Sequence, residues 1–178
     1  MTRATVIDLP DEFDTWAVGY DSFYVQGSRG DLEFRLARKI VMAGRRWTNV
    51  IDGLIRAKTG QTRGRWQTLF AIAFSEPPLT TSALAERMDV QWPTLVRVLE
   101  GLERDGLITR TENPADKRSR FIAVTPSGDR LIREIKPMLD TARAQAFAGL
   151  DNDELELCST LLTRLLDRTK RWRDLEGD

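Results

Sequence analysis

Apolar side chains recur at helical spacing along the first half of the chain. From position 32 they follow one another every three or four residues, which places them on one face of a helix. They are Leu32, Leu36, Ile40, Ala43, Trp47, Val50 and Leu54. A seam of this kind is typical of helices that pair with another helix. The pattern predicts a long amphipathic helix that ends in the polar stretch 58–64.

Three shorter helices are expected next. The segment 66–76 is almost entirely apolar, so it should be a helix buried on most sides. Thr80 can cap a second helix through its hydroxyl group. A third helix spans 91–105, where Pro93 suits the first turn because that position needs no backbone donor. Gly106 can end it in a left-handed conformation.

The pattern then changes to strict alternation. Residues 108–113 and 120–125 alternate apolar and polar side chains and pair naturally as a β-hairpin. Thr125 can cap a further helix that begins with a proline. Asp151 and Glu154 have the spacing of a capping box and open the last helix. The predicted fold is mainly α with a small β-hairpin. The three short helices followed by the hairpin form a winged helix-turn-helix, and the remaining helices form a helical dimerisation region.

Net charge is zero but unevenly distributed. The 178 residues contain 27 Lys and Arg and 27 Asp and Glu. Residues 1–31 hold two arginines and six carboxylates, a net charge of −4, so the remainder carries +4. A mildly basic body is compatible with binding a polyanion. The acidic extension also contains several aromatic residues, so we expect it to be irregular but packed against something.

Several classes of function are excluded by residue types. The chain contains no histidine, which removes histidine-based nucleophilic catalysis and histidine-ligated zinc. It has no glycine-rich phosphate loop and a single cysteine, Cys158, which cannot form an internal disulfide. We therefore expect no enzyme activity and no cofactor. Cys158 is interpreted as a small buried apolar residue, with a redox sensor as the alternative.

Targeting signals are not evident. The N-terminus lacks a basic region followed by an apolar run. The longest purely apolar run is 69–74, too short to span a bilayer. A cytoplasmic protein without a membrane partner is the expectation.

The helix at 91–105 has the side chains of a DNA-recognition helix. In helix-turn-helix proteins the second helix of the pair enters the major groove. The candidates near its start are Gln91, Trp92, Thr94 and Arg97. Arginine bonds bidentately to guanine, glutamine bonds to adenine, and threonine can contact a thymine methyl group or a phosphate. The alternative is that Arg97 is only a solvated surface charge.

Positive charge also gathers at the hairpin tip. Lys117, Arg118 and Arg120 lie on or beside the turn, with Arg110 just upstream. A basic turn on a narrow ribbon can enter the minor groove, where the potential is most negative. Asp116 is expected to hold the Arg118 guanidinium in a charge-assisted pair. The alternative is a solvated turn with scattered charge.

These residues resemble a known family. The stretch 66–125, with LAERM, PTLVRVLEGLERDGLITR and ADKRSRFIAVT, is similar to the DNA-binding lobe of the MarR family, and within it to the SlyA-type branch. The resemblance implies a homodimer, with 32–62 and 126–178 forming the helical dimerisation region. It makes 63–125 the DNA-binding lobe and leaves 1–31 as an acidic N-terminal extension.

The resemblance also implies roles for individual residues. Arg97 falls on the recognition-helix arginine, Arg118 on the wing arginine with Asp116 as its brace, and Thr94 on a small hydroxyl residue. The implied function is a transcriptional regulator that binds pseudo-palindromic double-stranded DNA. Such regulators are often released by a small aromatic or amphipathic anion.

Candidate effector residues are cationic and aromatic. An aromatic carboxylate needs apolar walls and a cation. Arg45, Arg46, Trp47 and Trp66 are of these types and lie in matching regions. The alternative is that both tryptophans belong to the core. Two other functions of the same fold stay open: a winged-helix protein-interaction adaptor, and a thiol-redox regulator. The acidic extension could also compete with DNA for the basic surface.

Overall fold

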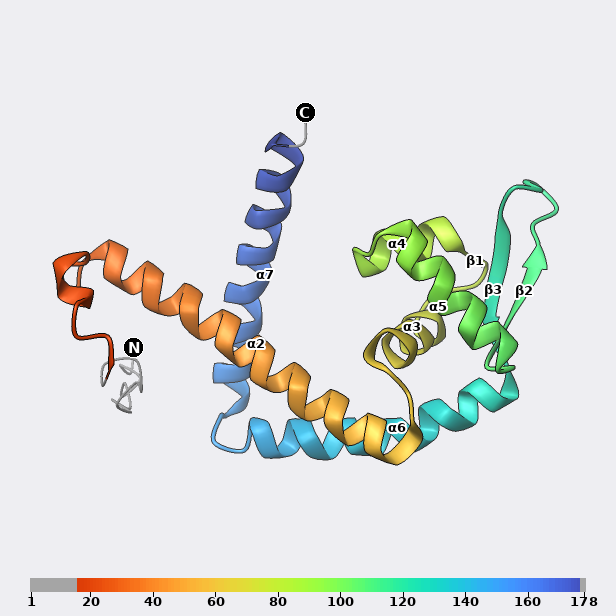
Figure 1. Ribbon diagram of the computed structural model, residues 1–178, viewed down its shortest axis with the longest axis horizontal. Helices are drawn as coiled ribbons and strands as arrows, with labels where there is room; N and C mark the ends of the chain where they lie inside the picture. Colours follow the sequence, from red (N-terminus) through yellow and green to blue (C-terminus); the bar gives the residue numbers. More distant parts are fainter. Residues whose placement is uncertain (1–15, 177–178) are drawn as a thin grey trace. The chain divides into compact units, whose positions relative to one another are not determined.

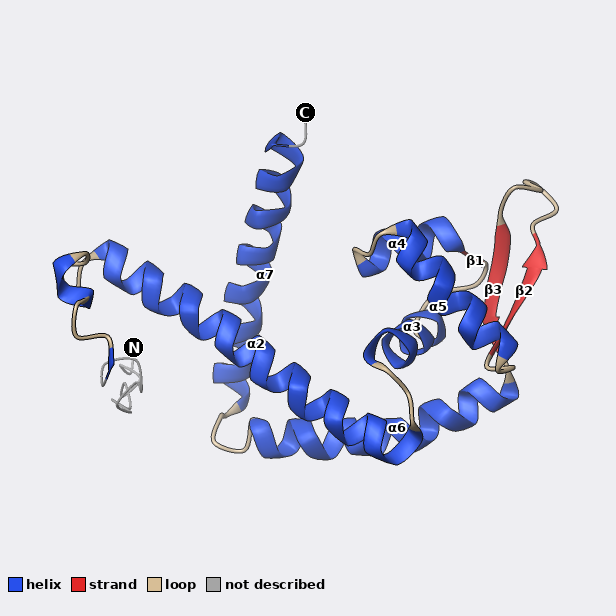
Figure 2. Ribbon diagram, in the orientation of Figure 1, coloured by secondary structure: helices blue, strands red, loops and turns tan. Residues whose placement is uncertain are grey.

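The computed structural model describes residues 16–176 and is dominated by helices (Figure 1, Figure 2). The chain divides into two compact units, 1–50 and 51–178. The fold class is as predicted, mainly helical with a small antiparallel sheet. The sheet has three strands, however, where the alternating pattern predicted two.

The first unit contains a short 3-10 helix, η1 (Tyr20–Ser22), and most of the long helix α2 (Arg29–Thr59). α2 begins three residues before the predicted start, so the end of the extension is helical rather than irregular. The Asp31 amide donates to the Ser28 hydroxyl at 3.3 Å, which caps the first turn. The part of the extension before residue 16 lies outside the described residues.

The second unit begins with the end of α2, where Ile51 and Ile55 are buried. Its other elements are α3 (Arg63–Ala73), β1 (Leu79–Thr80), α4 (Thr81–Met88), α5 (Trp92–Arg104), β2 (Ile108–Glu112), β3 (Arg120–Val124), α6 (Pro126–Ala146) and α7 (Asn152–Glu176). Apart from the additional strand β1, this order matches the predicted order. α3 starts three residues earlier than predicted. Thr62 has an extended conformation, and the helix begins at the next residue, Arg63.

The core of this unit is aliphatic and centred on α5. Leu95, Leu99 and Leu102 repeat along its inner face and are almost fully buried. α5 contacts α3, α4 and β2, which contribute the buried residues Leu69, Ile72, Leu84 and Ile108 to the same core. One side of α5 is therefore fixed by apolar packing, which leaves the opposite side for solvent or a ligand.

The sheet has the order β1-β3-β2. β2 and β3 form the predicted hairpin, with Ile108 opposite Val124 and Glu112 opposite Arg120. β1 adds two residues, with Leu79 opposite Ile122. A two-residue strand has no alternation to detect, which is why the sequence pattern missed it.

The predicted caps are present. The Ala83 amide donates to the Thr80 hydroxyl at 3.2 Å, and the Gly128 amide donates to the Thr125 hydroxyl at 3.1 Å. Gly106 has a φ of +67°, the left-handed conformation expected after α5. These local contacts fix where α4, α5 and α6 start or end.

The last helix, α7, starts at the predicted capping box. The Asp151 amide donates to Glu154 at 3.0 Å, and the Glu154 amide donates back to Asp151 at 2.9 Å. Beyond this turn nearly every described residue of α7 is exposed in the single chain. Cys158 is among them, so the prediction that it is buried is wrong for the isolated chain. The residues that flank Cys158 on α7, Leu157 and Ser159, are exposed as well.

None of the helices within the described part of the chain is long and apolar enough to cross a bilayer.

Candidate nucleic-acid interface

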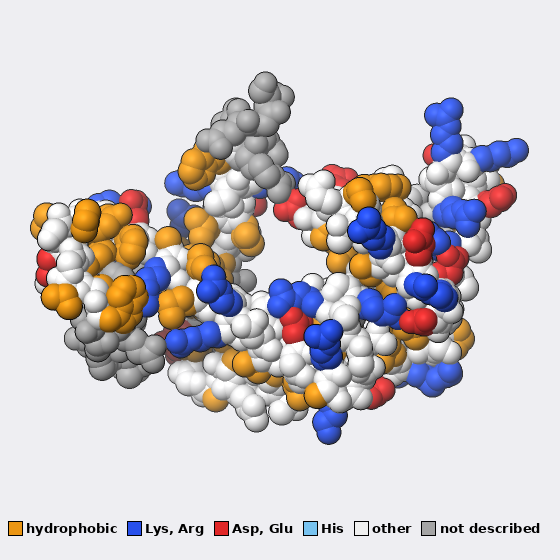
Figure 3. All heavy atoms as spheres, in the orientation of Figure 1, with side chains coloured by type: hydrophobic (Ala, Val, Ile, Leu, Met, Phe, Trp, Pro, Cys, Tyr) orange, Lys and Arg blue, Asp and Glu red, His pale blue; other side chains and the backbone are white. Residues whose placement is uncertain are grey.

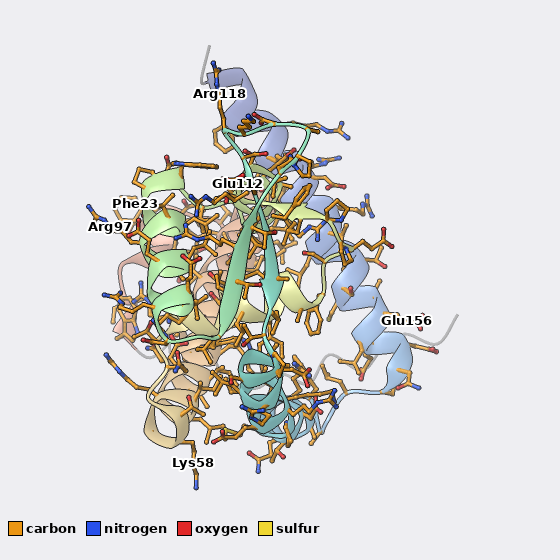
Figure 4. All side chains as sticks on the ribbon, turned by 90° about the vertical axis from the view of Figure 1, so that its right-hand side faces the viewer. Phe23, Lys58, Arg97, Glu112, Arg118 and Glu156 are labelled. Carbon is orange, nitrogen blue, oxygen red and sulfur yellow. The ribbon has the colours of Figure 1, made fainter. Side chains whose placement is uncertain are left out.

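The exposed face of α5 carries the four residues expected to read DNA. Gln91, Trp92, Thr94 and Arg97 are all exposed. Gln91 is the residue before the first turn, but its side chain makes no capping hydrogen bond. Its side-chain amide is therefore not used to cap the helix. Figure 4 shows Arg97 projecting from α5 away from the lobe.

Polar contacts also anchor α5 at its far end. Arg65 of α3 forms a salt bridge with Asp105, directly after α5. The Arg65 Nε also donates to Gln61 at 2.8 Å. The helix is thus held by apolar packing along its length and by a charged contact at its C-terminus. Such support reduces the conformational freedom that binding would otherwise have to remove.

The hairpin tip is organised by main-chain and side-chain hydrogen bonds. Asn113 donates to the Ser119 hydroxyl at 2.8 Å and accepts from the Ala115 amide at 3.0 Å. The Ser119 amide donates to the Asp116 carbonyl at 3.0 Å. The turn is therefore a defined structure that carries its charged residues outward.

The basic residues of the tip are solvent-exposed. Lys117, Arg118 and Arg120 all lie on the surface, and blue side chains extend from the tip in Figure 3. Arg118 lies at the end of the ribbon in Figure 4 and points away from it. Arg120 lies opposite Glu112 in the hairpin register. Lys117 and Arg118 thus form the cationic end of the lobe.

Asp116 has a different role from the one predicted. Its carboxylate accepts a hydrogen bond from the main-chain amide of Arg118 at 3.0 Å, not from the guanidinium. An aspartate that bonds the amide two residues ahead forms an Asx turn. Asp116 therefore shapes the turn, and in this structure it does not direct the Arg118 side chain.

Arg110 is held in an ion pair rather than presented to solvent. Its Nε donates to Glu103 Oε2 at 2.8 Å, and its Nη2 donates to the same oxygen. The Arg110 guanidinium is the main cause that holds the pKa of Glu103 below its usual range. Because Glu103 lies near the end of α5 and Arg110 on β2, the pair ties the hairpin to the helix. No local pattern indicates this pairing, because the two partners are seven residues apart and a turn lies between them.

The predicted effector residues fall on both units. Arg45 and Arg46 are exposed and Trp47 is half-buried on the first unit. Trp66 lies on the second, where its indole N–H donates to Asp52 at 3.4 Å and its ring meets Phe70 edge-on. Trp66 is thus partly a packing residue of the junction between α2 and α3. Among the described residues no cluster of carboxylates or thiols is arranged to hold a metal ion.

Comparison with known proteins identifies the lobe. A family model described as the MarR family matches residues 59–119. The transcriptional regulator PA3341, for which a crystal structure is known, has 30% sequence identity to this chain. The match covers 76% of this chain and 98% of the PA3341 chain, with a TM-score of 0.69.

The chain belongs to the MarR family.

Other MarR-like structures share the fold at lower identity. MepR of S. aureus, solved as a DNA complex, is 24% identical, covers 74% of this chain and 96% of its own, and gives a TM-score of 0.67. CouR of Rhodococcus jostii RHA1, solved with p-coumaroyl-CoA, is 24% identical, covers 76% of this chain and 91% of its own, and gives a TM-score of 0.63. The MarR family is one of transcriptional regulators, which are not enzymes.

Proposed function

We propose that this MarR-family protein is a homodimeric transcriptional regulator that binds pseudo-palindromic double-stranded DNA. The observation that carries the proposal is that Arg97 on α5 and Arg118 at the hairpin tip are both exposed and both project from the same lobe. A helix that fits the major groove and a basic ribbon that reaches the phosphates are the two contacts that winged helices use.

Base readout is assigned to the start of α5. Arg97 can donate two hydrogen bonds to a guanine, and Gln91 can bond an adenine. Thr94 and the exposed Trp92 offer methyl and ring surface to thymine methyl groups or sugars. We assign Lys117, Arg118 and Arg120 to phosphate and minor-groove contacts, with Asp116 holding the turn that presents them.

Dimerisation is supported by apolar surface that the single chain leaves uncovered. Leu157, Leu161, Leu162, Leu165 and Leu166 of α7 are exposed, as are Leu32, Leu36 and Val50 of α2. A monomer rarely exposes so continuous an apolar stripe. We therefore assign 32–62 and 126–178 to the dimerisation region and 63–125 to the DNA-binding lobe. A symmetric dimer places its two lobes on half-sites about 10 base pairs apart.

The regulator is proposed to respond to a small aromatic or amphipathic anion. Arg45, Arg46, Trp47 and Trp66 supply cations and aromatic surface for such a ligand. The p-coumaroyl-CoA bound to CouR is a larger anion, and it shares with this class an aromatic acyl group. A ligand that favours a spacing of the lobes unsuited to DNA weakens operator binding through the population of the two states. The hairpin motif ADKRSRFIAVT favours the SlyA-type branch within the family. We also assign the protein to the cytoplasm, because its proposed partner is DNA.

The test combines three measurements on the full chain. Duplexes are selected for affinity from a random pool, the selected site is footprinted, and binding is measured from low to high salt. We expect a two-fold symmetric footprint and affinity that falls steeply with salt. Light scattering of the free protein should give twice the mass of one chain. A monomeric mass, or affinity that does not change with salt, is incompatible with the proposal.

The effector is tested on the same complex. A panel of aromatic carboxylates and their coenzyme A thioesters is screened for release of the selected duplex. Arg45→Ala and Trp66→Ala should reduce the response to an active compound without changing DNA affinity in its absence. If no compound of the panel releases the duplex, the effector proposal is wrong while the DNA-binding proposal stands.

A further inference from the structure

The first turn of α3 carries side chains that bond in two directions. Arg63 forms a salt bridge with Asp52 near the end of α2, and the Trp66 indole N–H donates to the other oxygen of the same carboxylate at 3.4 Å. Arg65, which lies between them in the sequence, bonds instead to Asp105, directly after α5. One helical turn therefore connects the end of α2 with the end of the recognition helix.

Arg65 also lies against the backbone of α5, at a position where glycine leaves the room for it. Gly101 is buried, and a Cβ atom at this position would stand 2.7 Å from Arg65 Nη1. The Arg65 Nε donates to Gln61 at 2.8 Å, so the guanidinium is held from the linker side as well. Close by, a Cβ atom on Gly64 would stand 3.5 Å from a methyl group of Val98. The two helices thus approach each other closely along this turn.

The contact is suited to position a helix rather than to stabilise the fold. The side chain of Arg65 is 20% exposed and that of Asp105 is 53% exposed, so solvent screens the ion pair. Its geometry is nevertheless directional, because a guanidinium held by two acceptors has a fixed orientation, whereas apolar packing is non-directional. Arg65 therefore adds a fixed reference point to the leucine packing of α5.

Base contacts need such accuracy more than phosphate contacts do. Arg97 lies four residues, about one helical turn, before Gly101 on α5. A side chain that recognises a ligand must be held within about 0.5 Å of its productive position. A phosphate contact fixes register but carries no sequence information. A small rotation of α5 would therefore reduce discrimination between sequences before it reduced general affinity for DNA.

We propose that Arg65 is a positioning residue for base readout, and that the first turn of α3 is the joint through which the end of α2 sets the position of α5. Asp52 holds the joint from one side, while Gly101 and Asp105 hold it from the other. This inference rests on the proposed DNA-binding function. It adds residues outside the DNA interface that determine how accurately Arg97 is presented.

The first experiment breaks the bond between Arg65 and Asp105 from each side. Asp105→Asn removes a negative charge, and Arg65→Lys keeps the positive charge but loses the fork that spans both acceptors. We expect each variant to bind the selected duplex about tenfold more weakly and an unrelated duplex of equal length within about twofold of the parent, at equal salt. Fluorescence anisotropy measures both affinities.

Charge alone predicts the opposite result for one of these variants. A protein that has lost a carboxylate binds all DNA more tightly, so a pure charge effect makes Asp105→Asn a stronger binder of both duplexes. Glu100→Gln removes the same charge from an exposed position of α5 and is the matched control. It should keep the parent's ratio of selected to unrelated affinity.

The second experiment displaces the guanidinium without removing it. Gly101→Ala places a methyl group where Arg65 Nη1 lies, so the end of the arginine side chain has to move. Alanine favours a helix more than glycine does, so circular dichroism should show equal or higher helix content. We expect the ratio of selected to unrelated affinity to fall about tenfold nonetheless. In an Asp105→Asn background the same change should have less than about twofold further effect, because the bond is already broken.

The third experiment tests the link to α2. Asp52→Asn keeps an acceptor for the Trp66 indole and removes the charge that pairs with Arg63. We expect it to lower the ratio of selected to unrelated affinity at least about threefold. Independent sites would multiply their effects in a chain that also carries Asp105→Asn. A joint predicts that the double variant loses no more than the larger of the two single variants.

The outcomes separate the joint from the proposed function. An equal loss of affinity for both duplexes, tighter binding of both by Asp105→Asn, or an unchanged ratio in Gly101→Ala overturns the positioning role. Effects of Asp52→Asn and Asp105→Asn that multiply overturn the link to α2, while the role of Arg65 stands. A parent chain that prefers no duplex over an unrelated one contradicts the proposed function itself.

Discussion

The Arg110 guanidinium on strand β2 donates two hydrogen bonds to Glu103 at the end of α5. This pair joins the two parts of the lobe that are proposed to contact DNA. A shift of the hairpin therefore moves a residue that is bonded to the recognition helix. Arg110 is 18% exposed and Glu103 35%, so solvent screens the pair only in part.

The Glu103–Arg110 pair is expected to fix the hairpin. Glu103→Gln keeps the shape of the side chain and removes its charge. We expect the lobe to lose about 1 kcal/mol of stability, because a charge-assisted hydrogen bond becomes a neutral one. Amide exchange in β2 and β3 should accelerate. Glu100→Gln, on an exposed position of the same helix, is the control and should change neither quantity.

Arg97 is expected to determine one base of each half-site. Arg97→Ala should cost roughly 1–3 kcal/mol of binding to the selected duplex and relax the base preference at that position. Fluorescence anisotropy with single-base variants of the duplex measures both effects. Arg104→Ala, in the last turn of α5, should retain the preference. An unchanged preference in Arg97→Ala would remove this residue from base readout.

Arg118 is expected to contribute affinity without sequence preference. Arg118→Ala should weaken binding to all duplexes alike and lower the slope of log affinity against log salt by about one. Lys58→Ala removes an exposed cation from α2 and serves as the control. Equal slopes in the parent and Arg118→Ala would show that this side chain does not contact a phosphate.

Asp116 is expected to act through the shape of the turn. Asp116→Asn keeps an acceptor for the Arg118 amide, whereas Asp116→Ala removes it. We expect DNA affinity to fall in Asp116→Ala and to stay near the parent value, or to rise, in Asp116→Asn. The asparagine lacks the negative charge that repels phosphate. If both variants lose affinity equally, the charge of Asp116 matters and the guanidinium brace is restored as its role.

The N-terminal cap, residues 16–28 folded onto the start of α2, is expected to loosen at both ends of the pH range. Hydrogen bonds to Asp31, from Gly27 first and then from Arg35 and Tyr20, hold the pKa of that carboxyl below its usual range. Its stabilising contribution is therefore complete above the unfolded-state pKa, near 4, and is lost as pH falls through the lower folded value. Burial and the bond to Asp31 raise the pKa of the Tyr20 hydroxyl to about 12. The stabilising contribution of the neutral Tyr20 hydroxyl is complete below about pH 10, the pKa of an unfolded tyrosine. It is lost as the pH rises toward the pKa of the folded state.

The two transitions can be measured separately. Near-ultraviolet circular dichroism reports the stacked tyrosines, and absorbance near 295 nm reports ionisation of the Tyr20 hydroxyl. Asp31→Asn should abolish the acid transition of the cap. An acid transition unchanged in that variant would assign it to another carboxyl group.

Much of the lobe could be predicted because its determinants are local. The spacing of Leu95, Leu99 and Leu102 identified the inner face of α5, and hydroxyl caps at Thr80 and Thr125 identified two helix starts. Each depends on residues within one or two turns, so the sequence alone contains the information. The outward position of Arg97 follows from the same periodicity, since it lies opposite the leucines.

Contacts between distant segments were not predictable in this way. The strand β1 exists because β3 offers a free edge to Leu79 and Thr80. The cap depends on Tyr20 and Phe34 meeting across a turn. The Ser28–Asp31 spacing is a capping signal that could have placed the start of α2 correctly.

The sequence by itself determined the order of the helices, the hairpin and the positions of the basic residues on them. Periodicity and capping act over a few residues, so they leave a direct pattern in the chain. Only the tertiary structure decided which charges are paired. Arg110 is neutralised by Glu103, Asp116 bonds a main-chain amide, and Arg118 faces solvent. The Arg110–Glu103 pair is set by the packing of α5 against β2, which brings together side chains that the linear pattern leaves apart, whereas the Asp116 bond is local to the turn.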